Sequence, residues 1–415
     1  MKNKIFVMLF AIILGVITTI FVFNNNFFKK ELNRKSEKKD EINKNYNKDV
    51  KTIKETEIYV KDGNNYTKMG KIYKDVNLKL DKRKKNDKEK YFKVIDSDIY
   101  VYYEDVKPTD TYIENDRYKN YIPFNKNVKT KPNTKLYDSD RKLLYELYNS
   151  TDFKILVMDD DKYGVEYNNN ILYLNKEDAE EVYDNDNNSS NKKRIRTLTY
   201  HLIYNQSKRE CKEDICQSLD LLEQHLKYIR ENDYFTLKLD ELELYLSGKI
   251  NIPEKSIVLT IDDGTVFDLD ALKLLEKYKT NMTLFVITSV VNNIDKLKSD
   301  YLDLESHTHN MHNQYECPGY GMQGGGILCL PEEKVLEDLK TSQEKLGGSK
   351  YLSYPFFDFN ERAINLLKKA GFNLAFIGQY DTEGYSYPLI TDHYKVRRMT
   401  IFSDISMEEF IDYLN

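Results

Sequence analysis

The chain has 415 residues and a formal net charge of −5 at pH 7, with four cysteines and six histidines. This length allows two or three domains, each large enough to bury a core. A slightly acidic chain of this kind gives no indication of a nucleic-acid partner.

The first segment, residues 1–28, is predicted to be a signal anchor or a signal peptide. Met1–Lys4 is basic, and the nineteen residues Ile5–Phe23 carry no charge, which suits either kind of export signal. No small-x-small cleavage site is visible, so we favour an uncleaved membrane anchor with the bulk of the chain outside the cytoplasm. Six lysines and arginines between positions 29 and 39 lie on the expected outer side, against the usual charge rule.

Composition divides the rest of the chain into segments. Residues 29–55 are charged and rich in Asn, with almost no apolar content, and are predicted to be a flexible tether. Residues 184–195 are polar and form the clearest linker between domains. Two β-rich segments, 56–128 and 129–183, lie between the tether and the linker, and a larger domain, 196–415, follows.

The β-rich segments contain a repeated pattern. Tyr91–Asp105 and Tyr163–Asp178 each read as a strand, a polar turn, an aromatic-rich strand and then Glu-Asp. This self-similarity predicts two small all-β modules. The second module, with Asn133–Asp138 ahead of the repeat, resembles bacterial SH3-like domains, which often bind cell wall. Its tyrosines could stack on sugars, but packing within the modules is the expectation for most of them.

The C-terminal domain alternates predicted strands with predicted helices, which indicates a parallel sheet covered on both faces. Apolar runs mark the strands, while apolar stripes with Pro or Asn at the start and Gly at the end mark the helices. The expected strands are 195–201, 257–259, 283–288, 302–304, 350–354, 374–378 and 396–401, and the expected helices are 219–229, 272–278, 331–346 and 361–370.

Two adjacent carboxylates, Asp262 and Asp263, follow the predicted strand Ile257–Leu259 and precede Gly264, which permits a sharp exit from the strand. Two like charges at a buried strand end repel each other, and burial adds to the cost unless a positive group lies between them. By itself the pattern is equally consistent with an ordinary turn.

Three of the six histidines fall within one hexapeptide, as His307, His309 and His312, shortly after the strand-like Leu302–Leu304. Clustered imidazoles are the usual ligands of zinc and similar divalent metals. Beside a strand-end carboxylate they predict a mixed Asp/His site with an open coordination position, the pattern of hydrolytic metal centres. The alternative is a His-rich surface loop.

A third stretch places Tyr354, Pro355 and Phe356 between a strand and a helix that Asn360 caps and Gly371 ends. In this order and at these distances, the three stretches resemble the motifs of the polysaccharide deacetylases of carbohydrate esterase family 4, the NodB homology domain. The first corresponds to that family's Thr-Phe-Asp-Asp-Gly, the second to its His-based metal motif and the third to its aromatic-proline motif.

The resemblance covers about residues 196–415 and implies an α/β fold, a distorted (β/α)7 barrel with its site at the C-terminal ends of the strands. It also implies substrates outside the cell, which outweighs the charge rule at the N-terminus. The chain is most similar to the branch of poly-N-acetylglucosamine deacetylases, in which the second metal His follows the first by five residues. That spacing selects His307 and His312 and leaves His309 outside the ligand set. The segment Leu237–Pro253 resembles the same branch.

The resemblance implies a hydrolase acting on non-peptide amide bonds, which removes N-acetyl groups from peptidoglycan or poly-N-acetylglucosamine and releases acetate. The implied metal ligands are Asp263, His307 and His312. They would hold one divalent metal, expected to be zinc, with cobalt and nickel as alternatives. Asp262 would be the catalytic general base that takes a proton from the attacking water. The implied substrate-binding residues are Tyr354, Pro355 and Phe356, with a backbone N–H near Phe356 holding the oxyanion.

Two departures from the family pattern stand out. Ser353 occupies the position where many members carry an arginine, so the usual charge partner of the base is expected to be missing. No C-terminal Leu-x-His motif is found, and His393 does not match it well. The general acid is therefore unassigned, with His309 and His201 as weak candidates, and a structural role for His201 is at least as plausible.

The four cysteines fall into two pairs, Cys211 with Cys216 and Cys317 with Cys329. An exported chain can oxidise them, so we favour local disulfides or buried thiols over metal ligands. The Gly-rich stretch 319–328 lacks the Gly-Lys-Ser/Thr ending of a phosphate loop and is predicted to be a rim loop, pinned by the second pair.

A rival interpretation treats the chain as a catalytically weak, glycan-binding surface protein. The presence of all four metal and base positions argues against it. The sequence does not separate the two polymers, because the SH3-like modules favour peptidoglycan and the branch features favour poly-N-acetylglucosamine.

Overall fold

The computed structural model describes residues 49–81, 90–95, 97–109, 123–182, 193–319, 325–378 and 384–414. The predicted anchor, most of the tether and most of the linker lie outside the described residues. Within the described ranges, no helix is both long and apolar enough to span a membrane. The chain separates into two compact units, unit 1 with residues 1–117 and 130–151, and unit 2 with residues 118–129 and 152–415.

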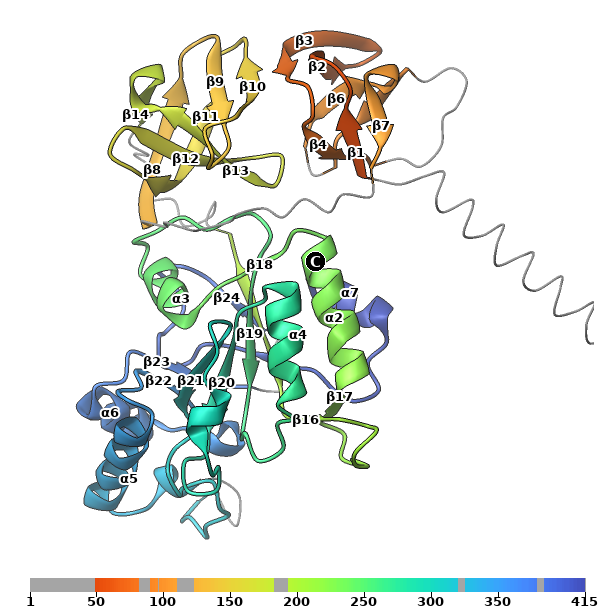
Figure 1. Ribbon diagram of the computed structural model, residues 1–415. Helices are drawn as coiled ribbons and strands as arrows, with labels where there is room; N and C mark the ends of the chain where they lie inside the picture. Colours follow the sequence, from red (N-terminus) through yellow and green to blue (C-terminus); the bar gives the residue numbers. More distant parts are fainter. Residues whose placement is uncertain are drawn as a thin grey trace, which may run out of the picture. The chain divides into compact units, whose positions relative to one another are not determined.

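Unit 1 consists of short antiparallel strands (Figure 1) whose side chains alternate between core and surface. Ile58, Ile72 and Val101 are fully buried. Tyr66 and Tyr91 remain partly exposed and stack on each other with ring centroids 4.2 Å apart, so these two rings pack mutually. The strands form two sheets. The first has the strand order β4 (Asn77–Lys79), β1 (Asp49–Thr52), β7 (Val106–Pro108). In the second, the neighbouring strands are, in order, β9 (Thr134–Tyr137), β10 (Leu143–Leu147), β3 (Asn65–Ile72), β2 (Thr56–Asp62), β6 (Ile99–Tyr102) and β5 (Tyr91–Lys93).

The two sequence repeats fold in the same way. In each, two antiparallel strands are followed by a 3-10 turn formed around Glu-Asp and then by a short strand. These elements are β5, β6, η1 (Tyr103–Asp105) and β7 in the first repeat, and β12 (Lys162–Tyr167), β13 (Asn170–Asn175), η2 (Lys176–Asp178) and β14 (Ala179–Val182) in the second. In unit 2, β14, β8 (Pro123–Thr130), β11 (Asp152–Met158), β12 and β13 are neighbours in that order. The predicted repeat is confirmed, whereas the likeness to SH3-like domains stays a prediction.

The rest of unit 2 is built on a parallel sheet, as the alternation of strands and helices predicted. Its order is β23 (Leu374–Phe376), β22 (Tyr351–Ser353), β21 (Leu302–Ser306), β20 (Met282–Val286), β19 (Ser256–Ile261), β15 (Ile195–Tyr200), with β24 (Tyr385–Ser386) antiparallel at β15. The segment after β24 closes the sheet: Val396 pairs with Phe376 beside β23, and β25 (Met399–Thr400) pairs with β15. The sheet therefore returns to its first strand, as a (β/α) barrel requires. Shorter strands are β16 (Leu202–Tyr204), β17 (Cys216–Ser218) and β18 (Phe235–Thr236).

Six helices of the described chain surround this sheet, and Figure 1 shows α2 beside α4 and α5 beside α6. They are α2 (Leu219–Glu231), α3 (Leu239–Leu246), α4 (Asp270–Tyr278), α5 (Glu332–Lys345), α6 (Glu361–Ala370) and α7 (Met407–Leu414). The helix α6 shows how the sequence sets their limits. The Asn360 side chain accepts a hydrogen bond of 2.8 Å from the Ala363 N–H, and Gly371 ends the helix with φ of 85°.

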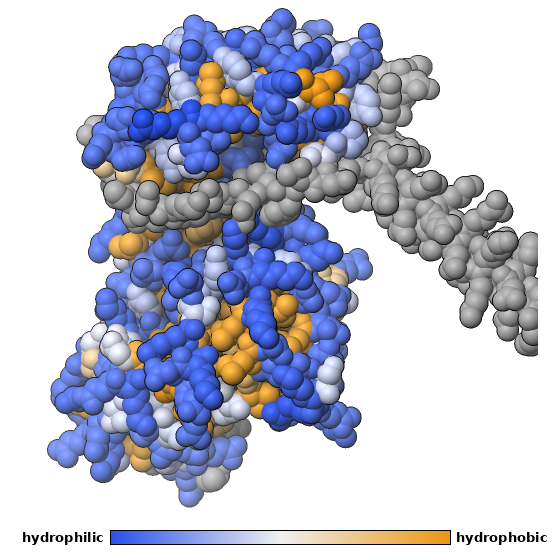
Figure 2. All heavy atoms as spheres, viewed as in Figure 1, coloured by the Kyte–Doolittle hydropathy of each residue, from blue (hydrophilic) through white to orange (hydrophobic). Residues whose placement is uncertain are grey.

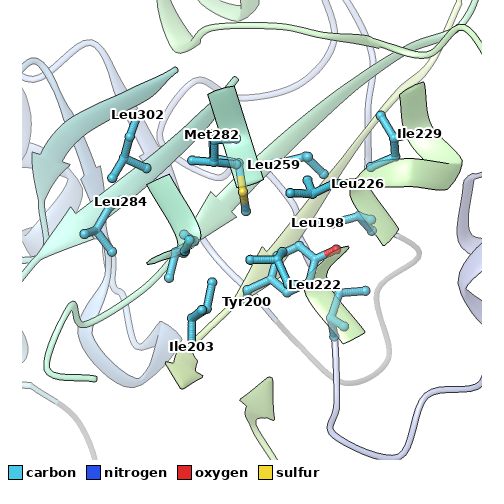
Figure 3. Close-up of a cluster of buried hydrophobic side chains, with 14 of the residues drawn as sticks. Leu198, Tyr200, Ile203, Leu222, Leu226, Ile229, Leu259, Met282, Leu284 and Leu302 are labelled. Atoms are coloured by element: carbon cyan, nitrogen blue, oxygen red, sulfur yellow. The ribbon is translucent and has the colours of Figure 1, made fainter. Parts of the chain in front are cut away.

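The core lies between the strands and the helices that cover them. Figure 3 shows Leu222, Leu226 and Ile229 of α2 together with leucines of the strands, and all of these side chains are almost fully buried. Burying one such side chain contributes about 1.5–3 kcal/mol. His225 lies in the same layer, where its ring stacks on Phe410 with centroids 3.8 Å apart and burial lowers its pKa to about 3. These contacts give His225 a structural role in the core. Figure 2 shows mostly hydrophilic side chains on the visible outer face.

The cysteines form two local disulfides, Cys211–Cys216 and Cys317–Cys329, so none is a free metal ligand. The disulfide alternative is confirmed. The prediction of a rim loop for the whole stretch 319–328 needs correction. Ile327 and Leu328, in η5 (Gly326–Leu328), are buried in the core against α5 and α6, because two large apolar side chains follow the glycines. Residues 320–324 lie outside the described part.

Candidate metal centre

The side chains singled out as metal ligands lie together at the C-terminal edge of the parallel sheet, where the strand ends meet. Asp263 comes two residues after β19, His307 directly follows β21, and His312 follows five residues later. The Nε2 atoms of His307 and His312 are each 3.3 Å from Asp263 Oδ1, and the three ligand atoms lie within 4.8 Å of one another. One carboxylate and two imidazoles with an open side form the donor set of catalytic zinc sites.

Hydrogen bonding fixes which nitrogen of His307 faces the site. The Nδ1 atom lies 2.8 Å from the Ser353 carbonyl oxygen, to which it donates, so the Nε2 lone pair points toward Asp263. Burial opposes charge on His307, but Asp262 and Asp263 raise its pKa above the ordinary value. Burial, assisted by His307, lowers the pKa of His312 to about 4, so this imidazole is neutral at pH 7. The carboxylates thus attract positive charge into the site, which a divalent metal would satisfy.

Asp262 is paired with Arg398 and is not one of the three candidate metal ligands. The guanidinium donates two hydrogen bonds of 2.7 Å, one to each carboxylate oxygen of Asp262, and the Ser353 hydroxyl donates a third of 2.9 Å. Arg398 is 0% and Asp262 1% exposed, so the pair is shielded from water. Burial alone would raise the pKa of Asp262, but Arg398 overrides it and holds that pKa well below the usual range.

The expectation that the base lacks a charge partner is therefore wrong. Arg398, from a later part of the chain, is the charge partner of Asp262. Ser353 contacts both residues, and its hydroxyl accepts a hydrogen bond of 2.7 Å from Arg398 Nη2. Sequence reasoning missed Arg398 because the residue comes 136 positions after Asp262. The sequence did contain one indication of this role. In the predicted strand 396–401, alternation places Arg398 on the same inward face as Val396, and a buried arginine requires an anion as its partner.

The aromatic-proline motif contributes less to the site than predicted. Tyr354 is fully buried and its hydroxyl donates to the Tyr394 carbonyl oxygen, so it packs the core and does not face a substrate. Pro355 is also buried. Only Phe356, 40% exposed, lies at the candidate centre, with its ring centroid 4.4 Å from that of His312.

Backbone strain gathers at the same place. Asp263, Thr308, Phe356 and Phe357 have φ of 72°, 68°, 56° and 60°, in the left-handed region that residues other than glycine rarely adopt. Each such conformation costs about 1–3 kcal/mol and persists only where surrounding contacts enforce it. Concentration of strained residues around a cluster of candidate ligands is typical of functional sites.

The two candidate general acids are placed differently. His201 follows β15, lies near Asp262 and Asp263, and has a buried Nδ1 without a hydrogen-bond partner in the described chain. Burial lowers its pKa, while the two carboxylates oppose that effect. His309 instead points at the Thr288 hydroxyl, with its Nδ1 2.9 Å from that oxygen. His201 is thus the available imidazole.

A cavity of about 240 Å3 opens beside the ligands. Its lining combines Asp263 and His312 with the uncharged side chains of Thr265, Ile287, Ser289, Val290, Asn310 and Asn313. The centre therefore has an accessible side for water and for a neutral polar substrate.

An Asp/His ligand set with an open side, next to an ion-paired carboxylate at the C-terminal edge of a parallel sheet, is an arrangement suited to a hydrolase. Comparison with known proteins agrees with a hydrolase. Residues 249–375 match the model of the polysaccharide deacetylase family.

Individual relatives are distant. YxkH of Bacillus subtilis (strain 168), which carries the same family name, is 26% identical over 161 residues, 37% of this chain and 55% of that protein. The chain thus spans about half the length of this curated relative. Among solved structures, a de-N-acetylase from Aggregatibacter actinomycetemcomitans is 19% identical (TM-score 0.47), covering 53% of this chain and all of that one. IcaB from Ammonifex degensii is 21% identical (TM-score 0.44), covering 53% and 95%.

Proposed function

We propose that this protein is a metal-dependent hydrolase that removes N-acetyl groups from N-acetylglucosamine in a cell-wall or surface polysaccharide and releases acetate. The observation that carries the proposal is the convergence of Asp263, His307 and His312 beside a separate carboxylate, Asp262, that Arg398 keeps ionised. A metal site without a second ionised group would hold a ligand but would have no side chain to take a proton from water.

The residues present divide the chemistry among them. Asp263, His307 and His312 would hold the divalent metal, whose contribution when bound is a water of lowered pKa and a polarised carbonyl. Asp262 accepts the proton of the attacking water, and its low pKa keeps it ionised at neutral pH. A backbone N–H near Phe356, whose ring lies beside that of His312, would hold the oxyanion. The products are acetate and a free amine on the sugar.

We propose that His201 donates a proton to the leaving amine after it has received the proton that Asp262 took from the attacking water. Replacement of His201 by Gln is expected to lower acetate release by about 10²–10⁴-fold, the usual contribution of a general acid, because no other described imidazole without a partner faces the carboxylates. Steady-state acetate release measures this, with Co2+ affinity as the control that the metal site is intact. Unchanged turnover would remove His201 from this role.

The test of the function is acetate release by the full-length chain, purified in detergent, from peptidoglycan and from poly-N-acetylglucosamine supplied separately with zinc. We expect release from one polymer, loss of release on chelation, and recovery when zinc is restored. Metal binding without release from either polymer would favour the alternative, a glycan-binding surface protein. Absence of metal binding would refute the mechanism.

We further propose that the protein works outside the cytoplasm, attached through residues 1–28, because its proposed substrates lie there. Protease treatment of intact cells should then degrade the protein. Complete protection that ends only on cell lysis would contradict this location.

A further inference from the structure

The loop between the two histidine ligands, residues 308–311, is held in a strained shape. Thr308 is fully buried with φ of 68°, a conformation that β-branched residues avoid. Its N–H donates to the Ser306 hydroxyl over 3.1 Å, and its own hydroxyl accepts from the Met311 N–H over 3.3 Å. Local bonds therefore shape the turn, but they do not tie it to the rest of the fold.

Asp338, in the middle of α5, supplies that tie. One carboxylate oxygen accepts the His309 N–H over 2.7 Å, and the other accepts the Asn310 N–H over 2.7 Å. Hydrogen bonds of backbone N–H groups to a carboxylate are about twice as strong as those between neutral groups. Asp338 is partly buried, so little water competes for these bonds.

The opposite side of the same loop is bonded to the exit of β20. The Thr288 N–H donates to the Thr308 carbonyl oxygen over 3.2 Å, and the Ser289 N–H donates to that of His309 over 3.0 Å. The loop thus lies between the end of one strand and one helix. Among these contacts, only those to Asp338 involve a charged group. Asp338 does not belong to any of the sequence motifs described above.

We propose that Asp338 is a positioning residue of the candidate metal centre, which holds the loop 308–311 so that His312 faces Asp263. His307 is fixed independently, by its own strand and by the Ser353 carbonyl, so the loop decides the position of only one of the two imidazoles. This inference rests on the proposed function, because it concerns the metal centre assigned there.

The test is a Co2+ titration of the full-length protein, followed by the visible absorption of the bound ion. Asp338→Asn keeps the shape of the side chain but replaces one accepting oxygen with a donating amide, so one loop N–H loses its acceptor. We expect the Co2+ dissociation constant to rise about 10–100-fold, as for other residues that orient metal ligands. Amide hydrogen exchange at His309 and Asn310 in the metal-free protein should become faster.

Two variants on the same helix are the controls. Glu337→Gln removes a neighbouring exposed carboxylate and should leave the affinity unchanged. Val335→Ala deletes buried methyl groups of the cluster that also contains Met311 and should lower the melting temperature, but it leaves the Asp338 carboxylate and its bonds to the loop in place, so it should also leave the affinity unchanged. A dissociation constant within twofold of wild type for Asp338→Asn, or an equal rise in Val335→Ala, would overturn the inference. A wild-type chain that binds no Co2+ would instead refute the proposed metal centre, and this role with it.

Discussion

Replacement of Arg398 by Met is expected to lower the free energy of unfolding by about 3–5 kcal/mol at pH 7 and to abolish acetate release. The Asp262 carboxylate, 1% exposed, would lose both bonds from the guanidinium and remain as a buried charge that keeps its hydrogen bond from the Ser353 hydroxyl. Its pKa would rise, because burial would no longer be opposed by Arg398. Urea unfolding followed by circular dichroism measures the stability.

The double variant Arg398→Met with Asp262→Leu is the matched control. Replacing a whole buried ion pair by apolar side chains is often neutral, so most of the lost stability should return while activity stays absent. Equal instability of the single and double variants would show that the cost comes from packing around residue 398 and not from the unpaired carboxylate.

The contribution of the pair should also depend on pH. The pKa of Asp262 is lowered in the folded protein, so its stabilisation is fully present above the unfolded pKa of about 3.9 and is lost as pH falls toward the lower folded value. The stability difference between wild type and Arg398→Met should therefore be largest at neutral pH, shrink as the pH falls through the raised pKa of Asp262 in the variant, and shrink further below about pH 4. A difference that grows on acidification would contradict this assignment.

Asp262 and Asp263 are neighbours in sequence, but their substitutions are expected to have different effects on metal binding and acetate release. In Asp262→Asn, Arg398 keeps an acceptor oxygen and the metal ligands are untouched, so Co2+ binding should persist while acetate release falls about 10²–10⁴-fold. In Asp263→Asn, the only carboxylate among the three ligands is lost, so metal binding and acetate release should both fall.

Titration with Co2+ and an acetate assay on the same preparations separate the two residues. Loss of Co2+ binding in Asp262→Asn would place this carboxylate among the ligands and remove it as the base. Retention of full activity in either variant would contradict the proposed mechanism.

The sequence alone was informative where chemistry depends on residues close together in the chain. Adjacent carboxylates at a strand end and three clustered histidines after another strand pointed to a metal centre, because parallel strands end at one edge of a sheet, and the family resemblance selected His307 and His312. Helix limits could also be predicted, since caps such as Asn360 and Gly371 act within a few residues. Both disulfides join cysteines near in sequence, which local spacing could suggest.

Only the tertiary structure decided what surrounds these residues. Arg398 reaches Asp262 because the last strand closes the sheet beside the first, a pairing that no local pattern encodes. Tyr354 was expected at the substrate and is instead buried, because the direction of a side chain after a strand depends on the helices packed there. Asp338 lies on a helix face that the sequence marks only as amphipathic, and its two bonds to the ligand loop exist only once α5 has packed against β21. The local motifs thus indicated the kind of chemistry, and long-range packing determined the charges and hydrogen bonds around the candidate site.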